Sequence, residues 1–471
     1  MNNPTDHPTN KPTASAVRYA LPAAIAVSVL VWQYGPGFLI TTLLFIAVLL
    51  PLVIVHELGH FTVAKLFGIK VLEFGVGIPP RAFGFRRGET EYTVNWAPVG
   101  GFVRMLGEED PTDPRSFAAQ SALKRIAVLA AGATMNAIAP IVLLTIAFMI
   151  PQDVMATDVA VVDVIDGAPA AEAGMQVGDI IISANGKDLV NSTTLQSIIQ
   201  LRLGADLDVI VERQGRRLAL HIDEVRVDPP AGQGATGILL TNARVSVASV
   251  DPGSTAAAVG LQEGDRFLRV NNSMIIDADD ATTVVASAFA TDPAAPITIE
   301  VLRNGAFVSL DGASAEGNLL GYTASLRPLV RESKSFFAAI PAAFSQLRDI
   351  LILFRNSIGS MISGTSSVEL AGPVGIAQIT GQVASAGIAP LVTWAALLSI
   401  NLAIVNILPI PALDGGRITF VLLELVRGGR KIAPEKERIV HLAGFALLIS
   451  AIFFITAKDL QRLFTGGSLF G

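Results

Sequence analysis

The sequence contains no cysteine among its 471 residues, which excludes disulfide bonds and thiolate metal ligands. Charge is also scarce, because 16% of the residues are charged while 51% are hydrophobic. The net charge of −6 provides no basic surface, so we expect no nucleic-acid partner. The composition is too apolar for an ordinary soluble enzyme and too charged for a protein made only of membrane spans. It predicts membrane segments combined with domains outside the bilayer.

Four apolar stretches approach or reach the length of about 20 residues that crosses a hydrocarbon core. They are 38–55, 127–150, 388–408 and 440–456. The expected fold class is therefore a polytopic α-helical membrane protein with four core spans, of which the first two fall within 38–150 and the last two within 385–471.

A shorter apolar run, 19–32, lies in an N-terminal extension, 1–37, and contains Pro22. It is a fifth short span, a re-entrant piece or the hydrophobic part of a signal peptide. The uncleaved alternatives are favoured, because no clear cleavage site with small residues follows it.

Loop charges predict the orientation. The stretch 61–125 holds nine Lys/Arg and seven Asp/Glu, and 417–439 holds six and three. The long section 151–387 holds 15 basic and 26 acidic residues. We therefore expect the two basic loops on the cytoplasmic side of the membrane and the acidic section outside it.

The outer section contains an internal repeat. "VIDGAPAAEAGMQVGDIIISANG" (164–186) matches "VDPGSTAAAVGLQEGDRFLRVNN" (250–272), so that Gly178-Asp179 corresponds to Gly264-Asp265. The shared pattern A-x-x-A-G-x-x-x-G-D resembles the PDZ family. The resemblance implies two tandem PDZ domains (α+β), at 155–228 and 236–328, inserted between the second and third core spans.

PDZ domains bind extended peptides by adding a strand to a sheet edge, so peptide termini are expected partners. The segment Gly237–Leu240 is the candidate binding loop by resemblance. The alternative is that both domains are spacers without a ligand.

An amphipathic helix is predicted over 335–364, after the second repeat. Its apolar face follows three- and four-residue intervals and consists of Phe337, Ile340, Phe344, Leu347, Leu351, Phe354 and Ile358. This face either lies on membrane lipid or packs against a PDZ domain.

Period-two alternation between the first two core spans predicts two strands. Tyr92, Val94 and Trp96 share one side of the second strand. We expect a membrane-associated β-hairpin at about 71–105, which is tolerated at membrane depth where protein shields its backbone or where it lines a cavity.

The motif His56-Glu57-Leu58-Gly59-His60 follows the first apolar stretch. On a helix, residues four apart share one face, so both imidazoles reach one metal ion, and Glu57 can take a proton from water. The alternative is a chance match in a polar helix end. It is disfavoured because the chain has only five histidines and ionisable groups at membrane depth are usually functional.

Two histidines leave a catalytic zinc site one protein ligand short. The stretch 401–417 offers a carboxylate, Asp414, after Pro409 and Pro411. Two prolines cannot remain inside a regular helix, so the backbone must unwind there and can turn Asp414 toward the histidines. The alternative is that Asp414 is an ordinary turn residue.

Two asparagines, Asn401 and Asn406, interrupt the third apolar stretch. Each either contacts substrate or forms a hydrogen bond to a neighbouring helix.

These motifs together resemble the site-2 protease family of intramembrane zinc metalloproteases, most closely its bacterial two-PDZ type, which regulates sigma-E. The resemblance runs from about residue 38 to 458 and rests on "HELGH", "NLAIVNILPIPALDGG" and the PDZ pair between them. One departure is Gly132-Ala133-Thr134-Met135-Asn136, where the family commonly has Gly-Pro-x-x-Asn.

The resemblance implies Zn²⁺ held by His56, His60 and Asp414, with Glu57 as the catalytic base. It implies that Asn401 and Asn406 help to hold substrate. It also implies that the strands of 71–105, with Tyr92, Val94 and Trp96, clamp the substrate in an extended form.

The leading hypothesis is an intramembrane zinc endopeptidase that cleaves a transmembrane protein already trimmed outside the membrane. By family, the expected substrates are anti-sigma factors or remnant signal peptides. One alternative is a non-catalytic PDZ scaffold, which the intact His56, Glu57, His60 and Asp414 disfavour. A metal transporter is another, but transporters usually repeat their spans.

Overall fold

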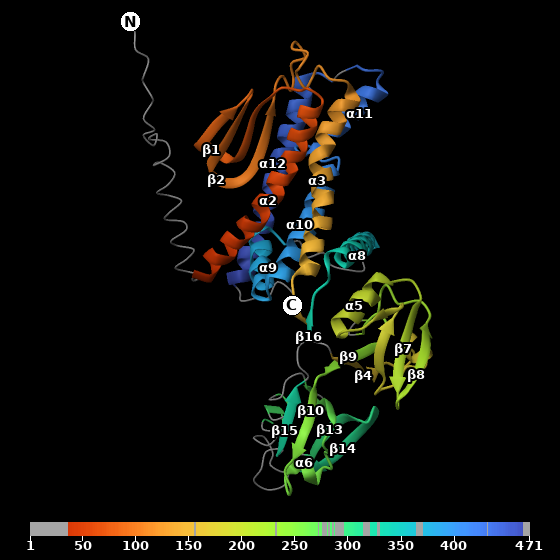
Figure 1. Ribbon diagram of the computed structural model, residues 1–471. Coiled ribbons are helices and arrows are strands. Elements are labelled where there is room, and N and C mark those ends of the chain that lie inside the picture. The colour runs from red at the N-terminus through yellow and green to blue at the C-terminus, as the bar shows by residue number, and fades with distance from the viewer. Residues whose placement is uncertain are drawn as a thin grey trace. The chain divides into compact units, whose positions relative to one another are not determined.

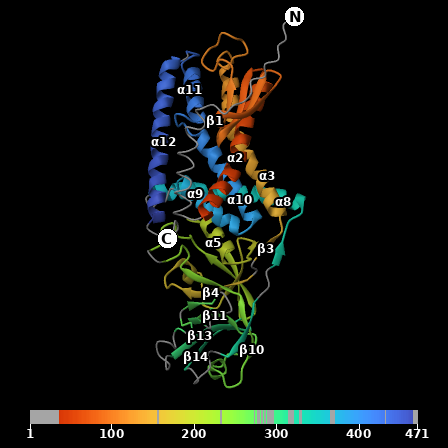
Figure 2. The ribbon, with the colours of Figure 1, turned by 90° about the vertical axis from the view of Figure 1, so that its left-hand side faces the viewer.

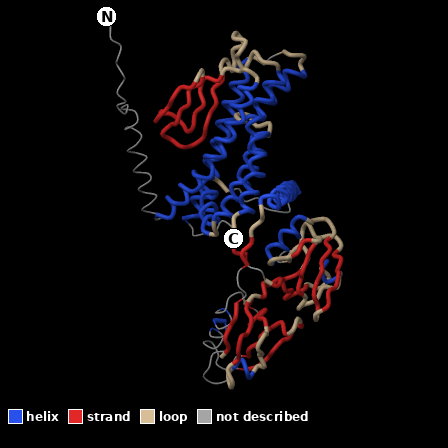
Figure 3. Tube along the Cα trace, viewed as in Figure 1, coloured by secondary structure: helices blue, strands red, loops and turns tan. Residues whose placement is uncertain are grey.

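The computed structural model describes residues 36–154, 157–230, 233–271, 273–275, 280, 283–284, 287, 296–313, 321–326, 330–363, 371–430 and 432–464. The chain divides into two compact units. The helical unit comprises 1–150, 334–347 and 369–471, and the sheet unit comprises 151–333 and 348–368. Figure 3 distinguishes the helices from the strands. The short apolar run 19–32 lies outside the described residues.

The helical unit is built around α3. Its helices are α2 (Pro36–Leu66), α3 (Ala122–Met149), α9 (Pro373–Ser385), α10 (Ile388–Ile407), α11 (Asp414–Val426), α12 (Pro434–Phe464) and the first half of α8 (Phe336–Ser363). Helix α3 contacts α2, α10 and α11 (Figure 1). The short α9 contacts α2, α10 and α12 (Figure 2). A central helix that contacts three others can hold groups from several segments around one point.

Five helices in the described part of the chain, α2, α3, α8, α10 and α12, are long and apolar enough to cross a membrane. Four of them cover the four apolar stretches expected to span, and the fifth is α8. Helix α12 has none of its most apolar window buried and exposes side chains such as Phe445, Leu447 and Phe453. Exposed apolar surface of this extent is unfavourable in water and is accommodated by lipid. The chain is a polytopic membrane protein with β elements.

The hairpin of β1 (Val71–Arg87) and β2 (Thr90–Met105) is bent over on itself. Residues 71–76 pair with 101–105 on one side and with 91–94 on the other. Residues 83–87 pair with the far side of 90–94. Two strands therefore give a sheet of four segments, with 101–105 at one edge. Strand β2 also contacts α2.

A buried core connects the first residue of β1 and the last residue of β2 to the helices. It contains Ala64, Ile69, Val71, Met105, Phe117, Val128, Leu129 and Val421. These residues come from α2, β1, β2, α3, α11 and the connecting loops, so this core fixes the end of α2 relative to α3 and α11.

The sheet unit contains two sheets with the same strand order. The first is β8-β7-β5-β4-β9 and the second is β14-β13-β11-β10-β15, each with a two-residue strand, β6 or β12, paired to its third member. The bounds in the first are β4 (Asp158–Val164), α4 (Pro169–Glu172), β5 (Ile180–Ala184), β6 (Lys187–Asp188), α5 (Ser192–Leu201), β7 (Leu207–Arg213), β8 (Arg216–Ile222) and β9 (Ile238–Ala243). Those in the second are β10 (Val245–Val250), α6 (Thr255–Ala258), β11 (Arg266–Val270), β12 (Ser273–Met274), β13 (Pro296–Arg303), β14 (Ala306–Ala313) and β15 (Tyr322–Leu326).

The Gly-Asp turns of the two matching sequences make the same contacts. Asp179 is fully buried and accepts two hydrogen bonds from Arg213, and Asp265 does so from Arg303. A buried carboxylate needs such pairing, and in each sheet the arginine comes from a later strand, Arg213 at the end of β7 and Arg303 at the end of β13.

The boundary between the two sheets differs from the one expected from the sequence. Strand β9 pairs with β4 and therefore belongs to the first sheet, although the expected second unit began at residue 236. The second sheet begins at Val245. A short segment such as 238–243 can indicate a strand but not the strand it pairs with, because pairing also depends on distant residues.

Helix α8 makes polar contacts with the first sheet on one face and exposes apolar side chains on another. In its second half, Asp349 pairs with Lys187 at 2.9 Å, and Asn356 donates to the carbonyl of Gln200 at 3.2 Å. Four apolar side chains seven residues apart remain exposed: Phe337, Phe344, Leu351 and Ile358. Packing against the first sheet and an apolar outer face thus coexist.

The long insertion begins and ends in paired strands. Strand β3 (Gln152–Val154) pairs antiparallel with β16 (Val330–Glu332), and Val154 is opposite Val330. The two ends of the segment 155–329 therefore leave from adjacent positions.

Candidate active site

Helix α2 carries the two histidines on one face. His56 and His60 are one turn apart, and their ring centroids lie 4.7 Å from each other. Only 8% of His56 and 7% of His60 are exposed. The two Nε2 atoms are 3.1 Å apart, so the spacing predicted from the sequence does bring both imidazoles to one point.

Asp414 meets them from the other end of the sequence. Helix α10 ends at Ile407 and helix α11 begins at Asp414, so residues 408–413 form a non-helical connection between the two helices. Its Oδ2 lies 3.0 Å from Nε2 of His56 and 3.2 Å from Nε2 of His60. A carboxylate at a helix N-terminus is also favoured by the helix dipole.

The two glycines after Asp414 let α11 fold back on the end of α10. A Cβ on Gly415 would lie 2.1 Å from the carbonyl oxygen of Leu408, and one on Gly416 would lie 2.4 Å from that of Ile410. Any side chain would push the first turn of α11 outward, and Asp414 with it.

A histidine on α12, His441, supports the break. Ala412 has a backbone φ of +80°, which residues other than glycine rarely adopt. Its backbone N–H donates to Nδ1 of His441 at 2.9 Å. Gly444 lies against Pro411, where a Cβ would approach the proline ring to 2.3 Å. His441 therefore lies next to the loop that precedes Asp414 and contacts its backbone.

Helix α3 approaches the histidines at Gly132. A Cβ there would lie 2.4 Å from Nε2 of His60 and 2.6 Å from Cε1 of His56. On the facing helix, a Cβ on Gly59 would lie 2.4 Å from the carbonyl oxygen of Ala131. Helix α3 is continuous through Ala133, where the family commonly has proline. The close approach therefore depends on glycine on both helices.

The three ligand atoms fit a zinc ion. Zinc bonds of about 2.0–2.1 Å in a tetrahedron put neighbouring ligand atoms roughly 3.3 Å apart. The triangle formed by His56, His60 and Asp414 has sides of 3.0, 3.1 and 3.2 Å. Two imidazoles and one carboxylate form a usual donor set for catalytic zinc.

Glu57 lies between this triangle and the sheet. It is close enough to both imidazoles and to Asp414 for electrostatic interaction. A Cβ on Gly101 would lie 2.9 Å from its Cγ. The edge segment 101–105 therefore begins beside the Glu57 side chain, a contact between distant residues that the sequence does not indicate.

The other predicted site residues lie outside the triangle. Asn401 and Asn406 are half-buried on α10, and five residues on a helix separate their directions by roughly 140°. Tyr92 packs with Phe61, Phe74 and Phe85. Val94 and Trp96 are 49% and 70% exposed on the sheet.

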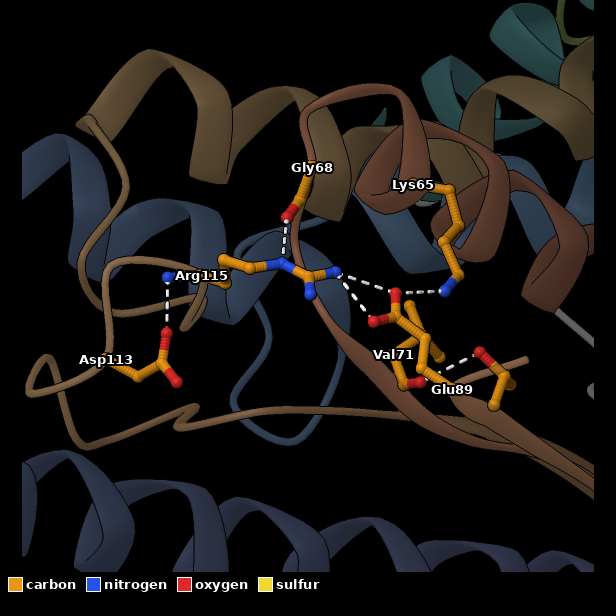
Figure 4. Close-up of polar contacts among 7 residues, drawn as sticks. Lys65, Gly68, Val71, Glu89, Asp113 and Arg115 are labelled. Atoms are coloured by element: carbon orange, nitrogen blue, oxygen red, sulfur yellow. Dashed lines mark hydrogen bonds and ion pairs between the residues drawn. The ribbon is translucent and has the colours of Figure 1, made fainter.

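An ionic cluster ties the turn of the hairpin to the end of α2 (Figure 4). Glu89 accepts from Lys65 at 2.8 Å and from Arg115 at 2.7 Å. The hydroxyl of Thr90 donates to the carbonyl of Val71 at 2.8 Å. The hydrogen bonds from Lys65 and Arg115 hold the pKa of Glu89 below its usual range, so this carboxylate stays charged at neutral pH.

Helix α11 is held by two further ion pairs beside a cavity of about 600 Å³. Arg125 donates to both carboxylate oxygens of Glu424 at 2.7 Å, and their side chains are only 10% and 12% exposed. Arg417 pairs with Glu108 at 2.6 Å. All four residues line the cavity, as does Ala412.

A second group of potential metal ligands in the described residues is Asp206, His221 and Asp223. All three are exposed, and the hydrogen bond with Asp208 raises the pKa of His221. Exposed carboxylates around a histidine are common without a metal, so the buried triangle is the candidate active site.

Comparison with known proteins decides the family. The model of "Peptidase family M50" matches residues 44–451, which include His56, His60 and Asp414. The chain belongs to peptidase family M50.

Curated M50-like relatives match along nearly their whole length. The zinc metalloprotease RasP of Geobacillus kaustophilus is 30% identical over 452 residues, covering 89% of this chain and 97% of that protein. A putative zinc metalloprotease of Neisseria meningitidis is 30% identical, covering 90% and 99%. The probable protease eep of Enterococcus faecalis is also 30% identical, covering 90% and 99%. The site-2 protease resemblance predicted from the motifs is confirmed.

Proposed function

We propose that this M50 peptidase is an intramembrane zinc endopeptidase whose ion is held by His56, His60 and Asp414. The observation that carries the proposal is the buried triangle of ligand atoms, with sides of 3.0–3.2 Å. The zinc metalloprotease names of relatives matched over about nine-tenths of the chain support the metal and the reaction.

Bound zinc supplies Lewis acidity toward a peptide carbonyl and activates water near neutral pH. Glu57 acts as the base: it takes a proton from the attacking water and passes it to the leaving amide nitrogen. The Cγ of its side chain lies against Gly101, which has no side chain to hinder an approaching peptide.

The substrate is the transmembrane segment of a membrane protein that has already been trimmed outside. A helical substrate hides its peptide bonds in its own hydrogen bonds, so it must be unwound and offered another partner. Segment 101–105 forms an edge of the sheet beside Glu57, which supports strand addition there. Val94 and Trp96, both exposed, and Tyr92 contribute the sheet surface in this proposal.

Asn401 and Asn406 hold the substrate from α10. Their diverging directions on the helix favour contacts with two different parts of the chain being cut. By family, that chain is an anti-sigma factor or a remnant signal peptide.

The active site faces the cytoplasm of a bacterium, and the sheet unit lies outside the inner membrane. The triangle lies toward the ends of α2 and α3 that border the hairpin and fall in the basic stretch 61–125, which supports this orientation. The acidic sheet unit then excludes substrates whose outer domains are bulky.

Substitution Glu57→Gln tests the mechanism. The protein is purified in detergent, its zinc content is measured, and cleavage of a transmembrane model substrate is followed. We expect wild-type zinc content and a loss of cleavage of at least about 100-fold, the contribution of a general base. Removal of zinc by a chelator should abolish cleavage in the wild type, and zinc should restore it.

Equal cleavage by wild type and Glu57→Gln contradicts the role of Glu57. Zinc retained by a wild-type protein that cleaves no transmembrane substrate favours the alternative function, a membrane scaffold.

We further propose that the two sheets are PDZ domains and that the first binds a peptide C-terminus. Strand β9 is an edge strand, so it can accept another strand. Arg226 donates to Gln233, but its Nε and Nη2 are buried without a partner among the described residues. Gly237, at φ +74°, lies beside that guanidinium, where a Cβ would be 2.8 Å from Nη2.

A peptide with a free C-terminal carboxylate tests this binding on the full-length protein. Fluorescence anisotropy should detect binding that is lost on amidation of the peptide and weakened roughly tenfold or more in Arg226→Met, because a charge-assisted hydrogen bond disappears. Equal binding of the free and amidated peptides would contradict the carboxylate site, and absence of binding to either would favour a spacer role.

A further inference from the structure

The orientation of the zinc triangle dictates where the histidines carry their protons. In both His56 and His60 it is Nε2 that faces Asp414. A neutral imidazole that coordinates through Nε2 keeps its proton on Nδ1 and usually donates it to a second partner. If His56 and His60 are the zinc ligands, as proposed above, each Nδ1 therefore needs a hydrogen-bond acceptor.

His60 has its acceptor on α3. Its Nδ1 lies 2.8 Å from the carbonyl oxygen of Val128, which is itself fully buried. This contact fixes both the tautomer and the ring orientation of His60.

The polar group beside Nδ1 of His56 is the amide of Asn136, which is 1% exposed. Its Nδ2 is 3.4 Å from that Nδ1, so two donors face each other when Nε2 binds a metal. Meanwhile Oδ1 of Asn136 is buried without a hydrogen-bond partner in the described part of the chain. Rotating the amide by 180° exchanges Oδ1 and Nδ2. Oδ1 then accepts the Nδ1 proton of His56, so the two donors no longer face each other and Oδ1 gains a partner.

Residues 128, 132 and 136 form one line along α3, since residues four apart lie on the same face of a helix. Val128 provides an acceptor, Asn136 provides one once its amide is turned, and Gly132 between them leaves room for both imidazoles. The hydroxyl of Ser399 on α10 donates to the backbone carbonyl of Asn136 at 2.8 Å. Helix α10 thereby holds this turn of α3 in place.

We propose that Asn136 is a positioning residue of the zinc site. Its Oδ1 accepts the Nδ1 proton of His56, which fixes the tautomer and aims Nε2 at the metal. The inference rests on the proposed zinc ligands and extends them to a residue that does not touch the metal.

Two substitutions that keep the number and branching of the side-chain heavy atoms separate positioning from packing. Asn136→Leu removes the acceptor, and Asn136→Asp keeps it. Zinc affinity is measured on the purified full-length protein by competition with a chromophoric chelator. Loss of such an outer partner typically weakens metal affinity 10–100-fold, so we expect about that loss in Asn136→Leu and none in Asn136→Asp.

The His56 tautomer gives a second readout that does not depend on proteolysis. The chain has five histidines, so ¹⁵N spectra of the zinc-loaded protein can be assigned by substitution. We expect a protonated Nδ1 with a hydrogen bond in the wild type and in Asn136→Asp, and a weakened hydrogen bond in Asn136→Leu. Thr134→Ala is the matched control on the exposed side of α3 and should bind zinc like the wild type.

Wild-type zinc affinity and an unchanged His56 signal in Asn136→Leu overturn the proposal. Equal losses in Asn136→Leu and Asn136→Asp also overturn it, because they indicate a packing role. His56→Ala separates this failure from that of the ligand set: wild-type zinc affinity in that variant refutes the ligands themselves. Should Asn136→Leu not fold, Asn136→Asp still decides, since weakened zinc binding in it contradicts the proposal.

Discussion

Gly132 is the residue of α3 that lies directly against His56 and His60, so the packing of the two helices bears on the proposed zinc site. The Gly132 backbone lies so close to both imidazoles that a Cβ there would contact them at less than 3.0 Å, a distance that real Cβ atoms essentially never show. The sequence contains this glycine within a family-like segment, but only the approach of α3 to α2 shows what it does.

Substitution Gly132→Ala should displace His56 and His60. The added Cβ would lie 2.4 Å from Nε2 of His60, so a ring or a helix must move. We expect zinc affinity to fall at least about tenfold, as for other disturbed ligand orientations, and cleavage to fall with it. Chelator competition and the cleavage assay measure the two effects.

Gly359→Ala is the control for this substitution, because a Cβ there meets nothing within 4 Å in helix α8. It should leave zinc binding unchanged. Unchanged zinc affinity in Gly132→Ala would show that the packing of α3 on α2 is looser than the structure has it.

At the scale of elements, the position of α11 determines where Asp414 lies. The break at 408–413 follows from Pro409 and Pro411 and was expected from the sequence. The supports of α11 were not expected, since they come from α3, from α12 and from the loop that contains Glu108. Charged residues in a sequence do not indicate their partners when those partners are distant.

The ion pair of Arg125 with Glu424 gives a test at this scale. Removing one partner leaves a charge buried, which typically costs roughly 3–5 kcal/mol. Glu424→Leu should therefore lower the thermal midpoint in detergent strongly and reduce cleavage, because α11 carries Asp414. The double variant Arg125→Met with Glu424→Leu should recover most of the stability, since buried pairs are often replaceable by apolar residues.

A double variant as unstable as Glu424→Leu alone would contradict this account and indicate that the ion pair itself is needed. Arg348→Met, on an exposed arginine of α8, is the control for loss of a surface charge and should change the midpoint little.

The hairpin shows the limits of pattern at the scale of elements. Alternation predicts strands near 71–105, and the structure has β1 and β2 there. The double pairing of 71–76 is not predictable from alternation, because it requires β2 to bend at Gly100-Gly101 and return along the other side of β1. That bend brings the edge segment beside Glu57.

At the scale of the whole molecule, the chain is a membrane peptidase interrupted by a large insertion. Strands β3 and β16 pair at the ends of that insertion, so it can be removed without separating the points where it is attached. This geometry allows the proposed exclusion of bulky substrates to be tested directly.

Replacing residues 155–329 by a short Gly-Ser linker should widen the range of substrates. The linker joins Val154 to Val330, which are already opposite each other. We expect the shortened protein to cleave a transmembrane substrate that carries a folded outer domain, which the complete protein leaves intact. Cleavage of a substrate with a short outer tail should be similar in both, as judged by gel analysis of the products.

The same excision combined with Glu57→Gln is the control and should cleave neither substrate. Failure of an otherwise active shortened protein to cut the bulky substrate would refute the size filter and leave docking as the role of the sheets.

Features that lie within one element follow from the local sequence. The four-residue spacing of His56 and His60 fixes them on one face because the pitch of a helix is constant. The apolar runs determine the spans, and two prolines determine the break before Asp414, because both effects act on the local backbone.

Contacts between groups that are distant in the sequence are known from the fold alone. The contacts of Gly132 and Asn136 with the histidines, of His441 with Ala412, and of Gly101 with Glu57 all join separate elements. Such contacts depend on how closely two backbones approach, and the same apolar pattern on a helix is compatible with several packing arrangements. The local sequence therefore predicts the proposed site residues in α2 and at Asp414, and the packing of α3, α11, α12 and β2 brings their surroundings together.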